Sequence, residues 1–117
     1  MRENPHFARK GKIRYVCYRE VFGMFLESEI EKKMKEKILK KGGLFFKFVS
    51  PGNDGVPDRI VITPKGRIIF VEMKEDKGRL SPIQKYQIER IRKCGCDCRV
   101  IKGRKESEEF IDEIFST

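Results

Sequence analysis

The feature that most constrains the fold of this chain is a pair of apolar, β-branched runs joined by a tight turn. Residues 59–63 and 67–74 are rich in Ile, Val and Phe, and the segment from Pro64 to Gly66 separates them. Runs of this kind across a short turn containing Gly predict a hairpin of two antiparallel strands. A hairpin alone is only marginally stable, so the chain has to bury it in a larger sheet covered by helices.

The segments on either side of the hairpin supply the rest of that fold. Apolar residues recur at helical spacing up to the stop signal at Gly42, and Ser81 with Pro82 makes a helix start after the hairpin. Helices are expected at about residues 27–39, 82–95 and 106–115, and further strands at 44–49 and 99–101. This order predicts an α/β fold with a mixed sheet of about four strands flanked by helices, and a helix crossover between the third and fourth strands.

Length and charge narrow the class of protein. A chain of 117 residues, 38% of them hydrophobic, has the size of one domain with its own core. It shows neither a signal peptide nor an apolar stretch near the ~20 residues of a membrane span, so the cytosol of a bacterium or its host, without a membrane partner, is expected. The net charge of +9 favours nucleic acid as partner; a surface that only keeps the protein soluble explains it equally well.

Two features of the sequence receive no catalytic role. Residues 1–23 form a basic extension, with six Lys or Arg against two Glu, ahead of a domain at residues 24–117. The extension is either a flexible DNA-binding arm or a segment that is absent if translation begins at Met24. Cys94, Cys96 and Cys98 are spaced unlike zinc ligand pairs, so reduced thiols at a helix-to-strand connection are expected, with metal binding or redox chemistry as the less favoured alternative.

The chemically informative residues lie at one end of the hairpin. Asp58 directly precedes the first strand, and Glu72, Met73 and Lys74 end the second. Alternation along a strand puts Glu72 and Lys74 on one face, and antiparallel pairing brings Asp58 opposite them. Two carboxylates with the backbone carbonyl of Met73 are oxygen ligands of the kind that Mg²⁺ prefers, and Mn²⁺ is expected to substitute. Such a site, with Lys74 stabilising developing charge or orienting the attacking water, predicts phosphodiester hydrolysis.

A plainer interpretation makes these residues the polar face of an edge strand, with Asp58 as a turn residue after Pro57. That interpretation suits each residue alone. It suits the set less well, because the apolar run 68–71 immediately before Glu72 lacks the alternation of a solvated face.

The first helix offers a further carboxylate. Glu31 lies at the border of the apolar stripe that is expected to pack on the sheet, from which a side chain can reach the metal. An ion pair with Lys35, four residues on, is an equal alternative, and Glu27 is the fallback ligand.

Residues from about Glu27 to Ile101, roughly two-thirds of the chain, resemble the VRR-NUC domain, a branch of the PD-(D/E)XK nucleases. The matching motifs are Ile30-Glu31, Gly42-Gly43, Lys47 to Gly52, Gly55 to Arg59, Val71 to Lys74, and Leu80 to Pro82 with Gln84. Their occurrence in this order is a strong signal, whereas an isolated Pro-Asp followed by Glu-X-Lys is weak. The resemblance implies a restriction-endonuclease-like core.

The same resemblance implies roles for single residues. It implies Asp58 and Glu72 as metal ligands, Lys74 as the catalytic lysine, Glu31 as the helix carboxylate and Gln84 as a supporting active-site residue. Without the resemblance, Gln84 is better explained as an exposed polar residue of its helix. Compact members are expected to act as homodimers on branched DNA and to resolve four-way (Holliday) junctions by paired nicks, which two symmetric sites suit, without an organic cofactor.

Basic residues near the site are candidates for holding DNA phosphates. They are Lys47, Arg59, Lys77, Arg79 and Lys85, and each is also explained as a solvated surface charge. Two other functions stay open: a non-catalytic nucleic-acid-binding module with a degenerate nuclease fold, and a nuclease for other branched, single-stranded or RNA substrates. The converging carboxylates argue against the first, because without a metal they repel phosphates.

Overall fold

The computed structural model describes residues 26–116, with side chains from residue 29 onward, so the basic extension lies outside the described residues. The elements in chain order are α2 (Leu26–Lys40), β1 (Leu44–Lys47), β2 (Arg59–Ile62), β3 (Ile68–Lys74), α3 (Pro82–Lys93), β4 (Asp97–Lys102) and α4 (Gly103–Phe115). The predicted order of elements is therefore confirmed. None of the helices in the described part of the chain is long and apolar enough to cross a membrane.

The four strands form one mixed sheet in the order β1-β2-β3-β4. β1 pairs with β2 and β2 with β3 in antiparallel orientation, whereas β4 runs parallel to β3. Two parallel neighbours need a crossover connection, which α3 supplies as predicted. As a result β3, the strand that carries Glu72 and Lys74, is paired on both sides.

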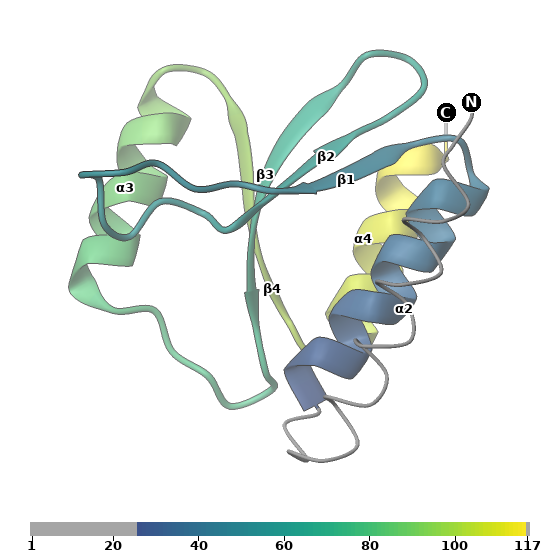
Figure 1. The fold of residues 1–117 in the computed structure, drawn as a ribbon, viewed down its shortest axis with the longest axis horizontal. Helices are drawn as coiled ribbons and strands as arrows, with labels where there is room; N and C mark the ends of the chain where they lie inside the picture. The colour runs from purple at the N-terminus through teal and green to yellow at the C-terminus, as the bar shows by residue number, and fades with distance from the viewer. Residues whose placement is uncertain (1–25, 117) are drawn as a thin grey trace, which may run out of the picture.

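Helices cover the sheet unequally. Figure 1 shows α2 and α4 side by side on one face and α3 on the other. Along β3 the side chains alternate between these two environments: Ile69, Val71 and Met73 belong to the hydrophobic core under α2 and α4. Because alternation is strict in a strand, Glu72 is directed to the opposite face, the side of α3.

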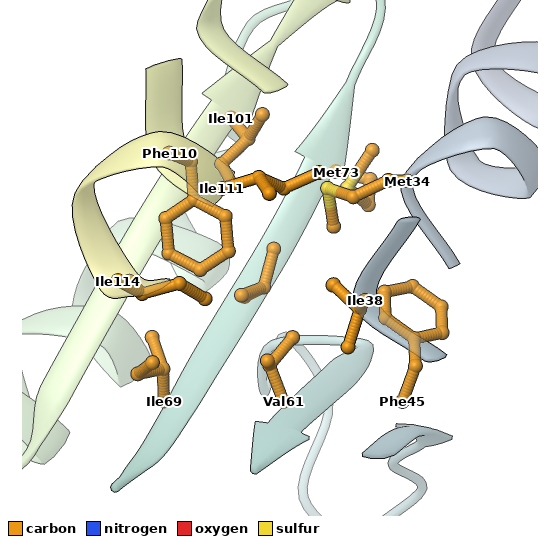
Figure 2. Packing of buried hydrophobic residues seen from close by; sticks show 11 residues of the cluster. Met34, Ile38, Phe45, Val61, Ile69, Met73, Ile101, Phe110, Ile111 and Ile114 are labelled. Carbon is orange, nitrogen blue, oxygen red and sulfur yellow. The ribbon is translucent and has the colours of Figure 1, made fainter. Parts of the chain in front are cut away.

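The core explains why the hairpin needed the flanking helices. Figure 2 shows apolar side chains from α2, α4 and all four strands in one cluster. Its members are Met34, Ile38, Phe45, Val61, Ile69, Val71, Met73, Ile101, Phe110, Ile111 and Ile114. Burial of a large aliphatic side chain contributes about 1.5–3 kcal/mol. One face of β3, which is paired along both edges, thus packs against a continuous apolar layer.

Several boundaries differ from the prediction: the strand predicted at 44–49 ends at Lys47 and the helix predicted at 82–95 ends at Lys93, but the largest differences lie at the C-terminal end. The predicted strand at 99–101 is longer, because β4 pairs with β3 in unbroken register from Asp97 to Lys102. The last helix begins at Gly103 rather than near residue 106. Gly103 has φ +77°, a backbone conformation that favours glycine, and a Cβ atom there would also displace the carboxylate of Asp76. The start of β4 depends on its pairing with β3, and the start of α4 depends on a contact with the loop after β3. The local sequence pattern does not predict such contacts between distant segments.

Candidate active site

Asp58 and the end of β3 meet at one end of the sheet. Arg59, the first residue of β2, pairs with Val71, which places Asp58 level with Glu72. Oδ1 of Asp58 accepts a hydrogen bond of 3.4 Å from the backbone N–H of Met73. On its other side, the carbonyl of Asp58 accepts the N–H of Phe48 at 2.9 Å. The structure thus brings these residues together as their spacing predicted.

Glu72 is the buried acid of this site. Only 4% of the residue is exposed, although it carries a carboxylate. Nζ of Lys74 lies 3.9 Å from Oε2 of Glu72, and Nε2 of Gln84 donates a hydrogen bond of 3.3 Å to the same oxygen. Taking a carboxylate out of water costs several kcal/mol unless charges and hydrogen bonds compensate. A buried acid flanked by a lysine at the end of a strand is therefore a candidate functional group.

Gln84 connects that acid to the start of α3. Ser81 caps the helix, its hydroxyl accepts the N–H of Gln84 at 3.3 Å, and Oε1 of Gln84 accepts the N–H of Ser81 at 2.9 Å. This capping box leaves the amide group of Gln84 directed at Glu72. The predicted location of Gln84 beside the site is thus what the structure shows, and its supporting role stays a prediction.

The loop before Asp58 is fastened to α3 by contacts that have no signature in the sequence. Gly55 has φ +86°, and a Cβ atom there would come within 2.8 Å of the carbonyl oxygen of Ile83. Two turns into the helix, the buried Gln87 donates a hydrogen bond of 3.0 Å to the carbonyl of Asp54. Gly55 was recognised only as part of a motif, and an isolated Gln carries no signal that reveals such a contact. The loop and the helix together therefore position Asp58 and Glu72.

Arg59 and Glu31, for which separate functions were predicted, form a largely buried ion pair. Nε of Arg59 donates to Oε2 of Glu31 at 2.7 Å, and Nη2 lies 2.5 Å from the same oxygen. Only 11% of the Arg59 side chain is exposed, compared with 20% for Glu31. This pair takes the place of the ion pair with Lys35 that was the alternative for Glu31. A phosphate contact by Arg59 and a metal-ligand role for Glu31 stay predictions.

The remaining predicted phosphate contacts are exposed residues. They are Lys47 at the end of β1, Lys77 and Arg79 in the loop after β3, and Lys85 on α3. Exposure leaves each available to a phosphate, and their role stays a prediction. The side chain of Glu27, the fallback metal ligand, lies outside the described residues.

The donor atoms of the site suit a hard divalent cation. Asp58 and Glu72 offer carboxylate oxygens beside the backbone of Met73, and Mg²⁺ prefers oxygen ligands while it keeps several waters. Among the residues whose side chains are described, no group of three or more His, Cys, Asp or Glu is arranged to hold a metal. The set is therefore one of two carboxylates, with Glu31 engaged by Arg59.

A second arginine cluster lies away from this site, and we call it the Arg99 cluster. Nη2 and Nη1 of Arg99 donate to Glu113 at 2.9 and 3.0 Å, and its Nε donates to Asp97 at 2.6 Å. Partial burial acts to raise the pKa of Asp97, but hydrogen bonds from Arg99 and Arg67 outweigh it and lower that pKa. The hydrogen bond from Arg99 lowers the pKa of Glu113.

Two of the three cysteines predicted at the helix-to-strand connection lie there, and the third lies in the strand, because β4 begins earlier than predicted. Cys94 and Cys96 are exposed free thiols between α3 and β4, and Cys98 is a buried free thiol in β4. Burial raises the pKa of Cys98 to about 11, so this thiol is protonated and unreactive at neutral pH. Cys17 lies outside the described residues.

Comparison with known proteins assigns the family. The model of the VRR-NUC domain matches residues 3–105, which is most of the chain and includes both the site and part of the extension set apart by the sequence analysis. The chain belongs to the VRR-NUC domain family. The candidate site lies within the matched residues.

Individual relatives agree with this assignment. The protein is 50% identical over 58 residues to the putative nuclease p44 of Acyrthosiphon pisum secondary endosymbiont phage 1, an alignment that covers 50% of this chain and 62% of that protein. A solved VRR_NUC domain is 36% identical with a TM-score of 0.69, covering 74% of this chain and 94% of its own. A second, a VRR_NUC domain protein at 20% identity and a TM-score of 0.61 over 76% and 87% of the two chains, shows the shared fold. The alignment spans less than two thirds of the length of the phage protein, and the comparisons together establish the family.

Proposed function

We propose that this chain is a metal-dependent endonuclease that hydrolyses phosphodiester bonds in DNA at the site formed by Asp58, Glu72 and Lys74. The observation that carries the proposal is the burial of Glu72, 4% exposed, between Lys74 and the Met73 backbone that Asp58 contacts. A structural role does not explain this arrangement, because an apolar residue at the same place avoids the cost of burying a carboxylate.

The residues divide the chemistry among themselves. Asp58 and Glu72 would hold Mg²⁺, or Mn²⁺ in its place, and the bound ion supplies a water of lowered pKa and positive charge at the phosphate. In hydrolysis, water adds to phosphorus, the bond to one bridging oxygen breaks, and that oxygen leaves with a proton. Lys74 brings a cation to the same side of the sheet as Glu72, where it orients the water or stabilises the negative charge that grows on the phosphate oxygens.

Gln84 and the α3 capping box keep the acid in place. The amide of Gln84 donates to one oxygen of Glu72 while its own carbonyl is held by the backbone of Ser81. Fixing the carboxylate before substrate binds reduces the reorganisation needed during reaction. Gln84 acts in this proposal through Glu72 rather than on the phosphate.

The proposed substrate is branched DNA, above all a four-way junction, cut by a homodimer in the cytosol of a bacterium or host cell. A net charge of +9 suits a substrate with several duplex arms close together, because each neutralised phosphate releases counterions. Two sites related by a two-fold axis suit the paired nicks that resolve such a junction.

A non-catalytic binding module is the alternative from another class, and a nuclease for single-stranded or RNA substrates is the alternative within this one. The buried Glu72 and the neighbouring Asp58 argue against the binding module, since carboxylates placed at a phosphate-binding surface weaken binding unless a metal screens them. Substrate choice within the nuclease class depends on surface shape, and comparing cleavage of different DNA structures and of RNA distinguishes these substrates.

The test is a cleavage assay on four-way junction, flap, duplex and single-stranded DNA and on RNA, with Mg²⁺ and with chelator. The matched variants are Asp58→Ala and Asp112→Ala, the second an exposed aspartate on α4. We expect Mg²⁺-dependent paired nicks in the junction by the wild type and Asp112→Ala but not by Asp58→Ala. Binding without cleavage by the wild type would favour the binding module, and cleavage that persists in chelator would contradict metal dependence.

A further inference from the structure

The most completely bonded charged group near the site is Arg59, a residue that the proposed chemistry does not use. It is 9% exposed and lies at the first position of β2. Its Nε and Nη2 face Oε2 of Glu31 on α2, and Nη1 donates a hydrogen bond of 2.8 Å to the backbone carbonyl of Asp58. Nη1 also lies 3.6 Å from Oδ2 of the Asp58 side chain. One guanidinium thus touches both the backbone and the carboxylate of the candidate metal ligand.

This geometry restricts Asp58 from one side and Met73 restricts it from the other. The guanidinium is planar and rigid, so fixing one edge on Glu31 fixes the direction of the remaining N–H groups. The carboxylate of Asp58 then lies between Nη1 of Arg59 at 3.6 Å and the N–H of Met73 at 3.4 Å. Moving Arg59 frees one of the two restraints on the Asp58 side chain.

We propose that Arg59 is a positioning residue for Asp58 and that Glu31 anchors Arg59 through Oε2. The inference rests on the proposed nuclease function, in which Asp58 is a metal ligand. It assigns the link between α2 and the site to an ion pair, and it removes Arg59 from the DNA-contacting set.

A phosphate contact by Arg59 conflicts with the burial of its side chain. It requires N–H groups that face Glu31 and Asp58 to turn toward DNA, although only 11% of the side chain is exposed. Moving them would leave the Glu31 carboxylate, itself only 20% exposed, without this partner, and breaking a buried pair is costly because an uncompensated charge remains. The pair uses Oε2 of Glu31, so it does not exclude a metal at Oε1.

Kinetics separate positioning from substrate binding. Arg59→Met is expected to lower kcat about 10- to 100-fold, the range found for groups that orient metal ligands, and to leave KM for DNA unchanged. Arg59→Lys should recover part of the loss because it keeps the charge. Arg67→Met is the matched control, since Arg67 is also paired, with Asp97, at the far end of β3. A raised KM with unchanged kcat would overturn the proposal in favour of a phosphate contact.

The Met73 amide reports on Asp58 without any catalysis. Hydrogen exchange of this amide, followed by NMR in metal-free protein, should accelerate in Arg59→Met because its acceptor, Oδ1 of Asp58, becomes mobile. The amide of Thr63, which donates to the carbonyl of Arg67 at the other end of the hairpin, is the internal control and should not change. Equal acceleration at both amides would mean general destabilisation, and no change at Met73 would mean that Arg59 does not hold Asp58; either result contradicts the proposal.

A double variant tests the anchoring role of Glu31. The kcat losses of Glu31→Gln and Arg59→Met should be less than additive when the two changes are combined, because both act on one contact. Additive losses would mean that Glu31 and Arg59 act independently and would overturn the proposal.

Failure of this inference and failure of the proposed function look different. A wild type that cleaves no substrate contradicts the nuclease function, and the Met73 amide then still tests the positioning of Asp58. A wild type that cleaves, together with an Arg59→Met variant of equal kcat, contradicts the positioning role alone.

Discussion

The sheet carries two arginine-centred clusters, and only one of them belongs to the candidate site. Arg59 joins Glu31 to Asp58 at the start of β2, and Arg99 joins Asp97 to Glu113 at β4. Both use the planar guanidinium to fasten a helix to a strand. In the Arg99 cluster, the carboxylates have Arg99 and Arg67 as partners and lie in partly or fully exposed positions.

The Arg59–Glu31 pair differs from the Arg99 cluster in the residues around it, not in the ion pair itself. Asp58 has a second carboxylate beside it, the buried Glu72, and a lysine within 3.9 Å of that acid. Among the described contacts of the Arg99 cluster, neither carboxylate is as buried as Glu72. Ion pairs between helix and strand are ordinary structural contacts, whereas two converging acidic groups, one of them buried, mark a candidate functional site.

The largest expected effect comes from neutralising the buried acid. Glu72→Gln keeps the shape of the side chain and removes the charge, so we expect kcat to fall about a thousandfold. Glu113→Gln, the matched change in the Arg99 cluster, should cleave at the wild-type rate. Single-turnover cleavage under Mg²⁺ measures both, and comparable losses in the two variants would erase the distinction between the clusters.

Lys74 should come next. Lys74→Met removes the cation 3.9 Å from Glu72, and we expect a fall in kcat of about a hundredfold with nearly unchanged DNA affinity. Lys102 is the control, because it pairs with Lys74 across the parallel strands and carries the same charge. Cleavage and filter binding together decide the point: weaker binding by Lys74→Met with unchanged kcat would make Lys74 a phosphate contact only.

A smaller effect should separate the support of Glu72 from the stability of α3. Gln84→Ala removes the amide that holds Glu72, whereas Ser81→Ala breaks the same capping box and leaves that amide in place. Ser81→Ala should cost about 1 kcal/mol of stability without loss of kcat. Gln84→Ala should also lower kcat, by about tenfold. Denaturant unfolding and cleavage assays measure the two effects, and equal kcat values would limit Gln84 to the cap.

The smallest expected effect is on stability in the Arg99 cluster. The pKa of Asp97 is lowered from 3.8 in the folded state, so its charge stabilises the fold fully above that pH. Asp97→Asn should therefore cost roughly 0.2–1 kcal/mol at pH 7, since the pair is partly solvated. The difference from wild type should shrink as the pH falls below 3.8 through the lowered value. Unfolding by urea at pH 7 and pH 3 checks this, and a difference that persists unchanged at pH 3 would contradict it.

The sequence was enough to predict the parts of the site that depend on local rules. Strand alternation and a three-residue turn place Asp58 level with Glu72, and a Ser-Pro helix start places Gln84 near them. Those relations depend on periods of two residues and on turn geometry, which are present in the chain itself.

Contacts between distant elements could not be predicted in the same way. Arg59 meets Glu31, 28 residues away, only because α2 packs on the sheet at one particular height. The same holds for Gly55 against Ile83, which depends on how closely the loop approaches α3. The position of α2 along the sheet and the distance between the loop and α3 follow from the packing of the whole core, so no local sequence pattern predicts them.

The central position of β3 has a consequence for how the site is lost on heating. Glu72 and Lys74 lie on a strand paired along both edges, so that strand opens only when the sheet as a whole unfolds. Asp58 precedes β2 beside a loop and is restrained by a few hydrogen bonds, so it can leave its place in a local fluctuation. Activity is then expected to fade below the melting temperature of the fold, with one half of the metal site still rigid after the other has become mobile.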